Sequence, residues 1–230
     1  MDKYLIEILE KFGFKKSDLT SLENYNPRDG FQIVVADNFN NMMEYLSKYS
    51  IYQDIVPILT DNNSNYICAY KSGVLFGRIC YLNHEETSLE PKFRNIENLI
   101  AAINKNTDCW DLYEFPETAF DYPQRDNKSF TEEDKTALVL LHKLFNNEPD
   151  EDKKVQISFC IMSLTPPNML KDIYPFLDND DMYIQERAIN TFGFHRYEPV
   201  IAKLRELVTT AKHNGKFAAT LALKKIESEQ

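Results

Sequence analysis

The sequence has few glycines and no long apolar run. Only 6 of its 230 residues are glycine, which argues against a glycine-rich phosphate-binding loop and favours helix. No apolar stretch approaches the roughly 18 residues that a membrane-spanning helix needs. Residues 1–16 lack the small-residue cleavage site of a signal peptide and carry Glu7 and Glu10 inside their apolar stripe. We therefore expect an amphipathic first helix, no membrane contact and a cytoplasmic protein.

Closely spaced metal-binding cysteines are also absent. Cys68, Cys80, Cys109 and Cys160 are scattered, so we expect reduced cysteines that mostly pack in the interior. The common nucleophile, P-loop and dinucleotide motifs are missing too. The sequence thus predicts no catalytic residues, no metal and no cofactor.

The charge is strongly negative, at −10. Residues 1–130 hold 20 acids and 13 bases, and residues 131–230 hold 16 and 13. Because phosphate neutralisation needs clustered Lys and Arg, nucleic acid is a poor partner. Two interpretations stay open: a surface matched to a basic protein partner, or charge that serves only solubility.

The first 105 residues alternate between helical and strand patterns, which predicts a mixed α/β domain. Pro57 should lie at an edge or a bulge, Ser72-Gly73 should form a hairpin turn, and Asp37 or Asn38 should cap a helix. Both faces of the 66–72 strand are apolar, so we expect a sheet covered on both sides. The expected helices are 2–12, the segment carrying Met42 to Tyr49, and 93–105; the expected strands are 31–36, 55–60, 66–72 and 74–82.

Residues 106–130 are acidic, aromatic and contain two prolines, which is typical of an irregular connector. Flexible linkers are poor in aromatic residues. We therefore expect this segment either to pack on a domain surface or to serve as a docking segment.

A repeat with an offset of 31 residues occupies the last hundred residues. Residues 173–192 align with 204–223, and small Ala188 matches Ala219 where two helices would cross. A weaker copy covers 138–145 and 153–164, followed by Pro166-Pro167 at an expected helix start. Residues 131–230 are thus predicted to form stacked helical pairs.

Two family resemblances follow from these patterns. The blocks YPFLDNDD…ERAINTFG and LRELV…GKFAATLALKKI resemble HEAT-like repeats over residues 136–227. Residues 31–105 resemble the SUKH superfamily, which includes fungal cell-wall-synthesis regulators and bacterial immunity proteins, at Pro57, Asp61, Tyr66, Ile67, Cys68, Tyr81, His84, Glu85, Phe93 and Leu99. The second resemblance implies a mixed α/β sheet that binds proteins, toxin domains among them.

Together these features predict an α+β protein: a SUKH-like domain over 1–105, a linker over 106–130, and HEAT-like repeats over 131–230. We expect a non-enzymatic binding protein with a protein partner such as a basic toxin domain, and its oligomeric state stays open. The residues that we expect to contact the partner combine acids with aromatic side chains; they are Asp61, Glu85, Glu86, Trp110, Asp111, Tyr113 and Glu114.

Two alternatives remain at this point. One is a scaffold or regulatory adaptor that binds through the helical repeats while the first domain only caps them. The other is a hydrolase with an unfamiliar site around Asp61, His84 and Glu85, which would have to converge in one pocket. The histidines of the repeat region, His142, His195 and His213, fit no ligand spacing.

Overall fold

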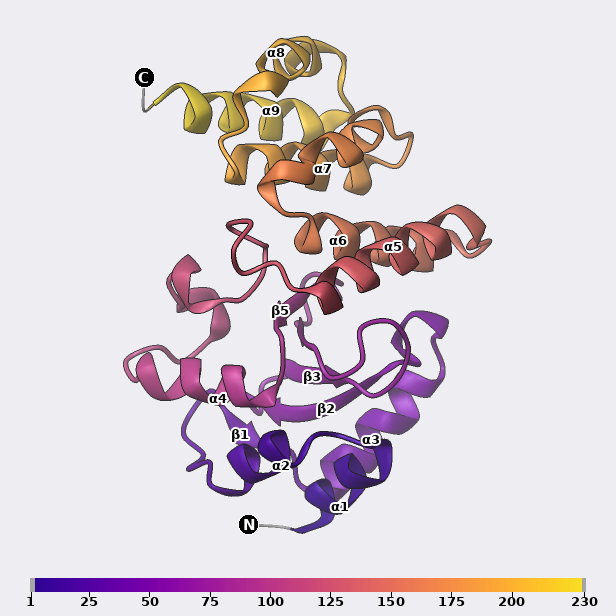
Figure 1. The fold of residues 1–230 in the computed structure, drawn as a ribbon. Helices are drawn as coiled ribbons and strands as arrows, with labels where there is room; N and C mark the ends of the chain where they lie inside the picture. Colours follow the sequence, from indigo (N-terminus) through magenta and orange to yellow (C-terminus); the bar gives the residue numbers. More distant parts are fainter. Residues whose placement is uncertain (1–2, 229–230) are drawn as a thin grey trace. The chain divides into compact units, whose positions relative to one another are not determined.

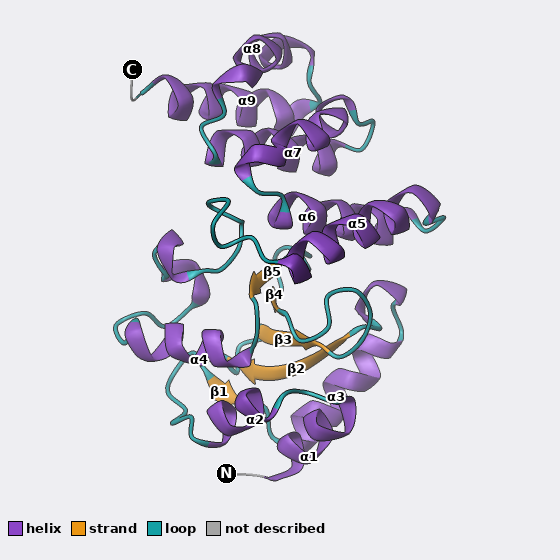
Figure 2. Ribbon diagram, viewed as in Figure 1, coloured by secondary structure: helices purple, strands orange, loops and turns teal. Residues whose placement is uncertain are grey.

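A computed structural model describes residues 3–228 and shows an α+β protein. The described residues up to Tyr122 form one compact unit, here called unit 1, and those from Pro123 onward form unit 2. Figure 1 follows the chain through both units, and Figure 2 shows that all strands lie in unit 1. The expected connector 106–130 is divided between them, with its first 17 residues, 106–122, in unit 1.

Unit 1 combines a sheet with helices and short 3₁₀ turns. Its strands are β1 (Gln32–Ile33), β2 (Ile55–Thr60), β3 (Tyr66–Tyr70), β4 (Ile79–Leu82) and β5 (Pro91–Phe93). Its helical elements are α1 (Lys3–Phe12), α2 (Lys16–Glu23), α3 (Ala36–Ser47), η1 (Ser50–Tyr52), α4 (Ile96–Lys105), η2 (Leu112–Glu114) and η3 (Glu117–Ala119).

The five strands form an antiparallel sheet in the order β1-β2-β3-β4-β5. The ladder shifts register between Pro57 and Leu59, so the expected bulge at Pro57 is confirmed, although β2 is an interior strand. Pro57 is paired with Cys68 and Leu59 with Ile67, so the extra residue of the bulge is Ile58, next to the proline. Cys68 lies directly opposite Cys80, and both are buried cysteines that form no disulfide.

Side chains on both faces of the central strands are buried, as expected. Ile67 and Ala69 of β3 join the main hydrophobic core, and the alternate residues Cys68 and Tyr70 are buried as well. The main core also takes buried residues from all four α-helices of the unit. They are Leu5, Leu9, Leu19, Leu22, Phe39, Ile96, Leu99, Ile100, Ala102 and Ile103.

Several expected boundaries in unit 1 are wrong. The expected strand 31–36 is a strand only over Gln32–Ile33, with one further hydrogen bond from Val34 N to Ile58 O (3.2 Å), because the chain turns into α3 at Ala36. Val35 precedes that helix without a side-chain cap, so neither Asp37 nor Asn38 caps it.

The hairpin between β3 and β4 is also longer than a two-residue turn. Residues 71–78 form its loop, in which Gly73 and Gly77 adopt φ of +77° and +81°. The loop closes through hydrogen bonds from Gly77 N to Tyr70 O (2.9 Å) and from Tyr70 N to Arg78 O (2.8 Å). The apolar residues 74–76 that suggested strand lie in this loop, where Leu75 is buried.

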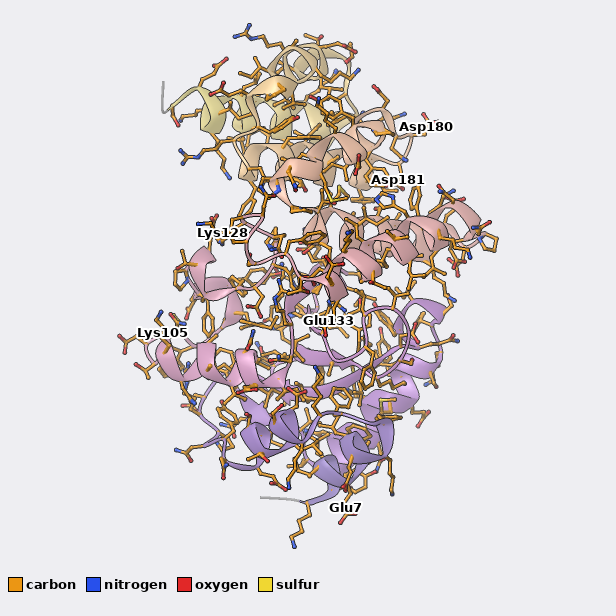
Figure 3. The ribbon with its side chains drawn as sticks, viewed as in Figure 1. Glu7, Lys105, Lys128, Glu133, Asp180 and Asp181 are labelled. Atoms are coloured by element: carbon orange, nitrogen blue, oxygen red, sulfur yellow. The ribbon has the colours of Figure 1, made fainter. Side chains whose placement is uncertain are left out.

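The regular elements of unit 2 are all helical within its described residues. Its elements are α5 (Glu132–Asn147), α6 (Glu151–Leu164), η4 (Pro167–Asp178), α7 (Met182–Phe194), η5 (Glu198–Val200), α8 (Ile201–Thr210) and α9 (His213–Glu227). Side chains at the turns start the helices: Thr131 and Asp134 form a capping box on α5, and Asp150 and Asp181 cap α6 and α7. Asp181 and its neighbour Asp180 mark the turn before α7 in Figure 3.

The 31-residue repeat is visible as matching helical pairs. η4 with α7 corresponds to α8 with α9, and the equivalent Ile173 and Leu204 are both fully buried. Ala188 and Ala219, the small residues at the crossing, are also fully buried. Gln185 and Gly193 of α7 contact Gly215 and Ala222 of α9 in the same order, so these two helices run parallel.

Candidate functional site

All seven residues expected to contact a partner lie in unit 1, on three loops that hydrogen bonds connect. These loops are residues 61–65, 83–86 and 110–114. We call the set of seven the acidic–aromatic patch; its members are Asp61, Glu85, Glu86, Trp110, Asp111, Tyr113 and Glu114.

The first loop is a tight turn organised by Asp61. Its carboxylate accepts hydrogen bonds from Asn63 N (2.7 Å), Asn65 N (3.0 Å) and Asn65 Nδ2 (2.7 Å). Asn62 and Ser64 adopt φ of 59° and 74°. Asn tolerates this left-handed region because its short side chain bonds locally, so the expected DNNSN turn is confirmed.

Asn65 joins the first loop to the second. Its Oδ1 accepts a hydrogen bond from His84 N (3.0 Å) and lies 2.9 Å from His84 Nδ1. Asn83 shapes the second loop by accepting from Glu85 N (2.7 Å) and Glu86 N (2.6 Å). The Glu85 side chain is 83% exposed, so its charge faces solvent.

The third loop is tied to strand β4 and to the second loop. The Tyr81 hydroxyl donates a hydrogen bond to Asp111 Oδ2 (2.6 Å), and Asn83 Nδ2 donates one to the hydroxyl oxygen of Tyr113. The rings of Tyr81 and Tyr113 meet edge to face with centroids 5.4 Å apart. Residues about 30 positions apart in the chain therefore share one surface.

Local hydrogen bonds give the third loop its conformation. Asp111 Oδ1 accepts from Tyr113 N (2.7 Å), and Glu114 Oε2 accepts from Trp110 N (2.5 Å). Asp111 thereby caps η2, while Glu114 is held beside the backbone of Trp110.

The turn at residues 26–30 contacts the backbone at the start of the third loop. Arg28 donates to Cys109 O (2.5 Å) and to Asn106 O (2.8 Å) and Ile103 O (3.3 Å) at the end of α4. Gly30 has φ of +81°, and a Cβ atom there would lie 1.8 Å from Trp110 O. Only glycine fits this close approach between two backbones.

Segment 106–122 supplies both core residues and exposed aromatic residues. Leu112, Phe115 and Tyr122 are buried, which is the expected packing on a domain surface. Trp110 and Tyr113 are 63% and 67% exposed. Leu112, Phe115 and Tyr122 thus pack on the domain, whereas the exposed Trp110 and Tyr113 are the residues to which the docking interpretation applies.

The tyrosines of this region keep their protons at neutral pH. Burial and then the Asp111 carboxylate raise the pKa of Tyr81, and burial and then Glu86 raise the pKa of Tyr113. Both phenols thus remain neutral, and the carboxylates determine the sign of the local charge.

The residues of the alternative hydrolase site, Asp61, His84 and Glu85, are not arranged as an acid–base pair. Asn65 lies between Asp61 and His84, and His84 Nε2 is 4.0 Å from Glu85 Oε1. Three N–H donors of its own turn occupy the Asp61 carboxylate, and Asn65 occupies His84 Nδ1. These contacts stabilise a turn and join two loops.

Neither a metal site nor a membrane-spanning helix is present among the described residues. Within residues 3–228, no three His, Cys, Asp or Glu side chains gather closely enough to hold a metal ion. In the same part of the chain, no helix has both the length and the apolar character needed to cross a bilayer.

A cavity of about 320 Å³ beside α4 was not expected from the sequence. Phe93 and Ala102 contribute apolar wall, and Lys105, at the end of α4 in Figure 3, is among the polar lining residues. Asp121 accepts hydrogen bonds there from Arg94 N and Asn98 Nδ2, both at 2.8 Å. The lining comes from two segments that meet only in the folded chain, so no local pattern indicates it.

No family model matches the chain, and comparisons with curated proteins and with solved structures give no significant match. The resemblances to the SUKH superfamily and to HEAT-like repeats therefore rest on the residues and blocks named above.

Proposed function

We propose that this protein is a non-enzymatic protein-binding module that acts as an immunity protein and neutralises a basic toxin domain. In this proposal unit 1 is a SUKH-like module and unit 2 is a HEAT-like repeat module. The carrying observation is the hydrogen-bonded assembly of three loops into the acidic–aromatic patch.

The exposed rings would supply the affinity. Trp110 and Tyr113 are amphipathic aromatics, the residue types that dominate binding hot spots. Each is held by hydrogen bonds at its backbone or hydroxyl, so little freedom would be lost on binding. The patch would then bind without rearrangement.

The carboxylates would supply the rate of association and the choice of partner. Acidic side chains beside the rings attract a basic surface and repel an acidic one. The negative charge of these carboxylates agrees in sign with the net charge of −10. None of the four cysteines forms a disulfide, not even the facing pair Cys68 and Cys80, which supports a reducing compartment such as the cytoplasm.

The test uses the full chain on a sensor surface and, as ligands, basic proteins encoded beside its own gene, each purified separately. Trp110→Ala and Tyr113→Ala should each weaken binding by about tenfold or more, mainly through faster dissociation. Tyr45→Ala, at another exposed tyrosine of unit 1, is the matched control and should bind like the parent chain.

Glu85→Gln combined with Glu86→Gln should slow association severalfold and flatten its dependence on salt. An association rate that ignores ionic strength in the parent chain would exclude electrostatic steering. Unchanged affinity after both ring truncations would exclude the patch as the binding surface.

A further inference from the structure

The helices α6, α7 and α9 form consecutive layers within the described part of unit 2, where one face of α9 is exposed. Arg187 of α7 lies over the ring of Phe159 in α6, with its guanidinium carbon 4.5 Å from the ring centroid. On its other side α7 packs on α9, where Glu186 Oε2 accepts a hydrogen bond from Asn214 Nδ2 (3.0 Å). The middle helix α7 thus packs through two faces.

The 31-residue offset identifies the corresponding open face of α9. Gln185, Glu186, Ile189 and Gly193 of α7 face α9. Their equivalents in α9, in the same order, are Lys216, Phe217, Thr220 and Lys224. All four equivalents are exposed. The repeat geometry therefore leaves a place beside α9 where a further parallel helix would pack.

Apolar residues lie at the centre of this open face. Phe217 is 69% exposed and Leu221 is 42% exposed, one helical turn apart. Large apolar side chains that neighbour each other on a surface are typical of interaction sites. We call Lys216, Phe217, Thr220, Leu221, Lys224 and Lys225 the α9 face.

Cations flank the apolar pair. Lys216 precedes it, and Lys224 and Lys225 follow it in the last turn of α9. Among the described residues, no recorded ion pair engages any of these three lysines. The only acid of the helix, Glu227, is bound to Arg205 at 3.0 Å. The α9 face is therefore positive on a chain whose net charge is negative.

We infer that the α9 face is a docking site for an acidic amphipathic helix of another protein. The equivalence to the α7 face that packs on a helix favours a helical partner, Phe217 and Leu221 favour an apolar stripe on it, and the lysines favour acids beside that stripe. Symmetric pairing of two copies through this face would place lysines against lysines, which disfavours a second copy as the occupant. The inference goes beyond the proposed function because it involves neither the acidic–aromatic patch nor a basic partner.

The test titrates the full chain into a fluorescent synthetic peptide of about 20 residues, long enough to form helix alone, with a leucine stripe flanked by glutamates. A peptide with the same stripe and lysines in place of the glutamates is the matched probe. Anisotropy should show binding of the glutamate peptide, at least about tenfold tighter than of the lysine peptide, and weaker with added salt.

Variants then locate the contact. Phe217→Ser should weaken binding of the glutamate peptide about tenfold, and Lys216→Glu with Lys224→Glu should abolish the preference for acid. All these side chains are exposed, so the fold should persist, which far-UV circular dichroism verifies. Val139→Ser and Lys143→Glu on exposed positions of α5 are matched controls and should leave binding unchanged.

Equal binding of the two peptides, binding that Phe217→Ser does not weaken, or no binding of the glutamate peptide would each overturn the inference. Absent peptide binding could be accompanied by Phe217-dependent binding to phosphatidylserine vesicles. The last outcome would assign the face to an anionic membrane. Self-association that Phe217→Ser removes, without peptide binding, would instead assign it to a second copy. Trp110→Ala should leave peptide binding intact, so this inference and the proposed function can fail separately.

Discussion

The two units bury their apolar surface in different ways. The core of unit 1 joins residues far apart in the chain, such as Leu5 of α1, Ile67 of β3 and Phe93 of β5. In unit 2 some buried positions recur at the 31-residue offset between two neighbouring helical pairs, as at Ala188 and Ala219. Local contacts close short loops at small entropic cost, whereas the sheet must close long ones. One chain therefore combines a unit specified by long-range pairing with a unit specified by repetition.

The largest expected effect tests the long-range core of unit 1. Phe93 is fully buried in β5, so Phe93→Ala should lower the free energy of unfolding of unit 1 by about 3–5 kcal/mol. Trp110, the only tryptophan, lies in unit 1, and its emission during denaturant titration follows that unit. Phe217→Ala, at an exposed ring of unit 2, is the control. A loss below about 1 kcal/mol would show that this part of the core is loosely packed.

The next largest effect is a dependence of the stability of unit 2 on pH. Burial, and then the charge of Arg125, lower the pKa of His195 in unit 2 from 6.5 to about 4. The unfolded chain protonates this imidazole more readily, so its contribution to stability is complete above pH 6.5 and is lost as the pH falls towards 4. The loss should amount to roughly 3 kcal/mol.

Denaturant titrations of unit 2, followed by helical circular dichroism at neutral and acidic pH, measure this dependence. His195→Gln should flatten it, and His213→Gln, at the exposed first residue of α9, is the control for loss of an imidazole. An unchanged slope in His195→Gln would show that other groups cause the acid sensitivity.

The smallest effect tests the close packing of repeated helices. A Cβ atom at Gly193 would lie 2.8 Å from Ala222 Cβ and 3.0 Å from Ala222 Cα. Gly193→Ala gains about 1 kcal/mol of helix propensity but loses about 1–3 kcal/mol by overpacking. We expect a net loss of about 1 kcal/mol in the stability of unit 2.

Ala222→Gly combined with Gly193→Ala tests this mechanism, because it removes the methyl group that the new side chain meets. The double variant should lose less unfolding free energy than the two single variants lose in sum. Simple additivity in the thermal or denaturant midpoints would exclude the proposed clash between α7 and α9.

The predictability of the two units differs for the same physical reason. The helices of unit 2 follow from periodicity, capping aspartates and the repeat, so α5, α6, α7, α8 and α9 are close to expectation. In unit 1 the strands β2, β3 and β4 were expected, but α2 and β5 were missed. β5 is short and pairs with β4 only when the chain returns to the sheet edge, which no local pattern records.

The acidic–aromatic patch shows which features of a site can be predicted from short stretches of sequence and which cannot. Residue type and charge selected its seven members, but nothing local indicated that three separate loops share one surface. That proximity depends on Asn65 and Asn83, two amides that link the loops and that the sequence did not single out. The open face of α9 likewise becomes visible only when the repeat offset is applied to contacts between helices.

The turn that contains Arg28 and Gly30 has a consequence for the thermodynamics of recognition. Because that turn fixes the backbone before Trp110, a partner would meet a surface already in its final shape. Complex formation by the acidic–aromatic patch should then resemble the joining of two rigid bodies, with backbone displacements within about 1 Å. Its heat-capacity change should match the apolar area covered, without the additional decrease that accompanies folding upon binding.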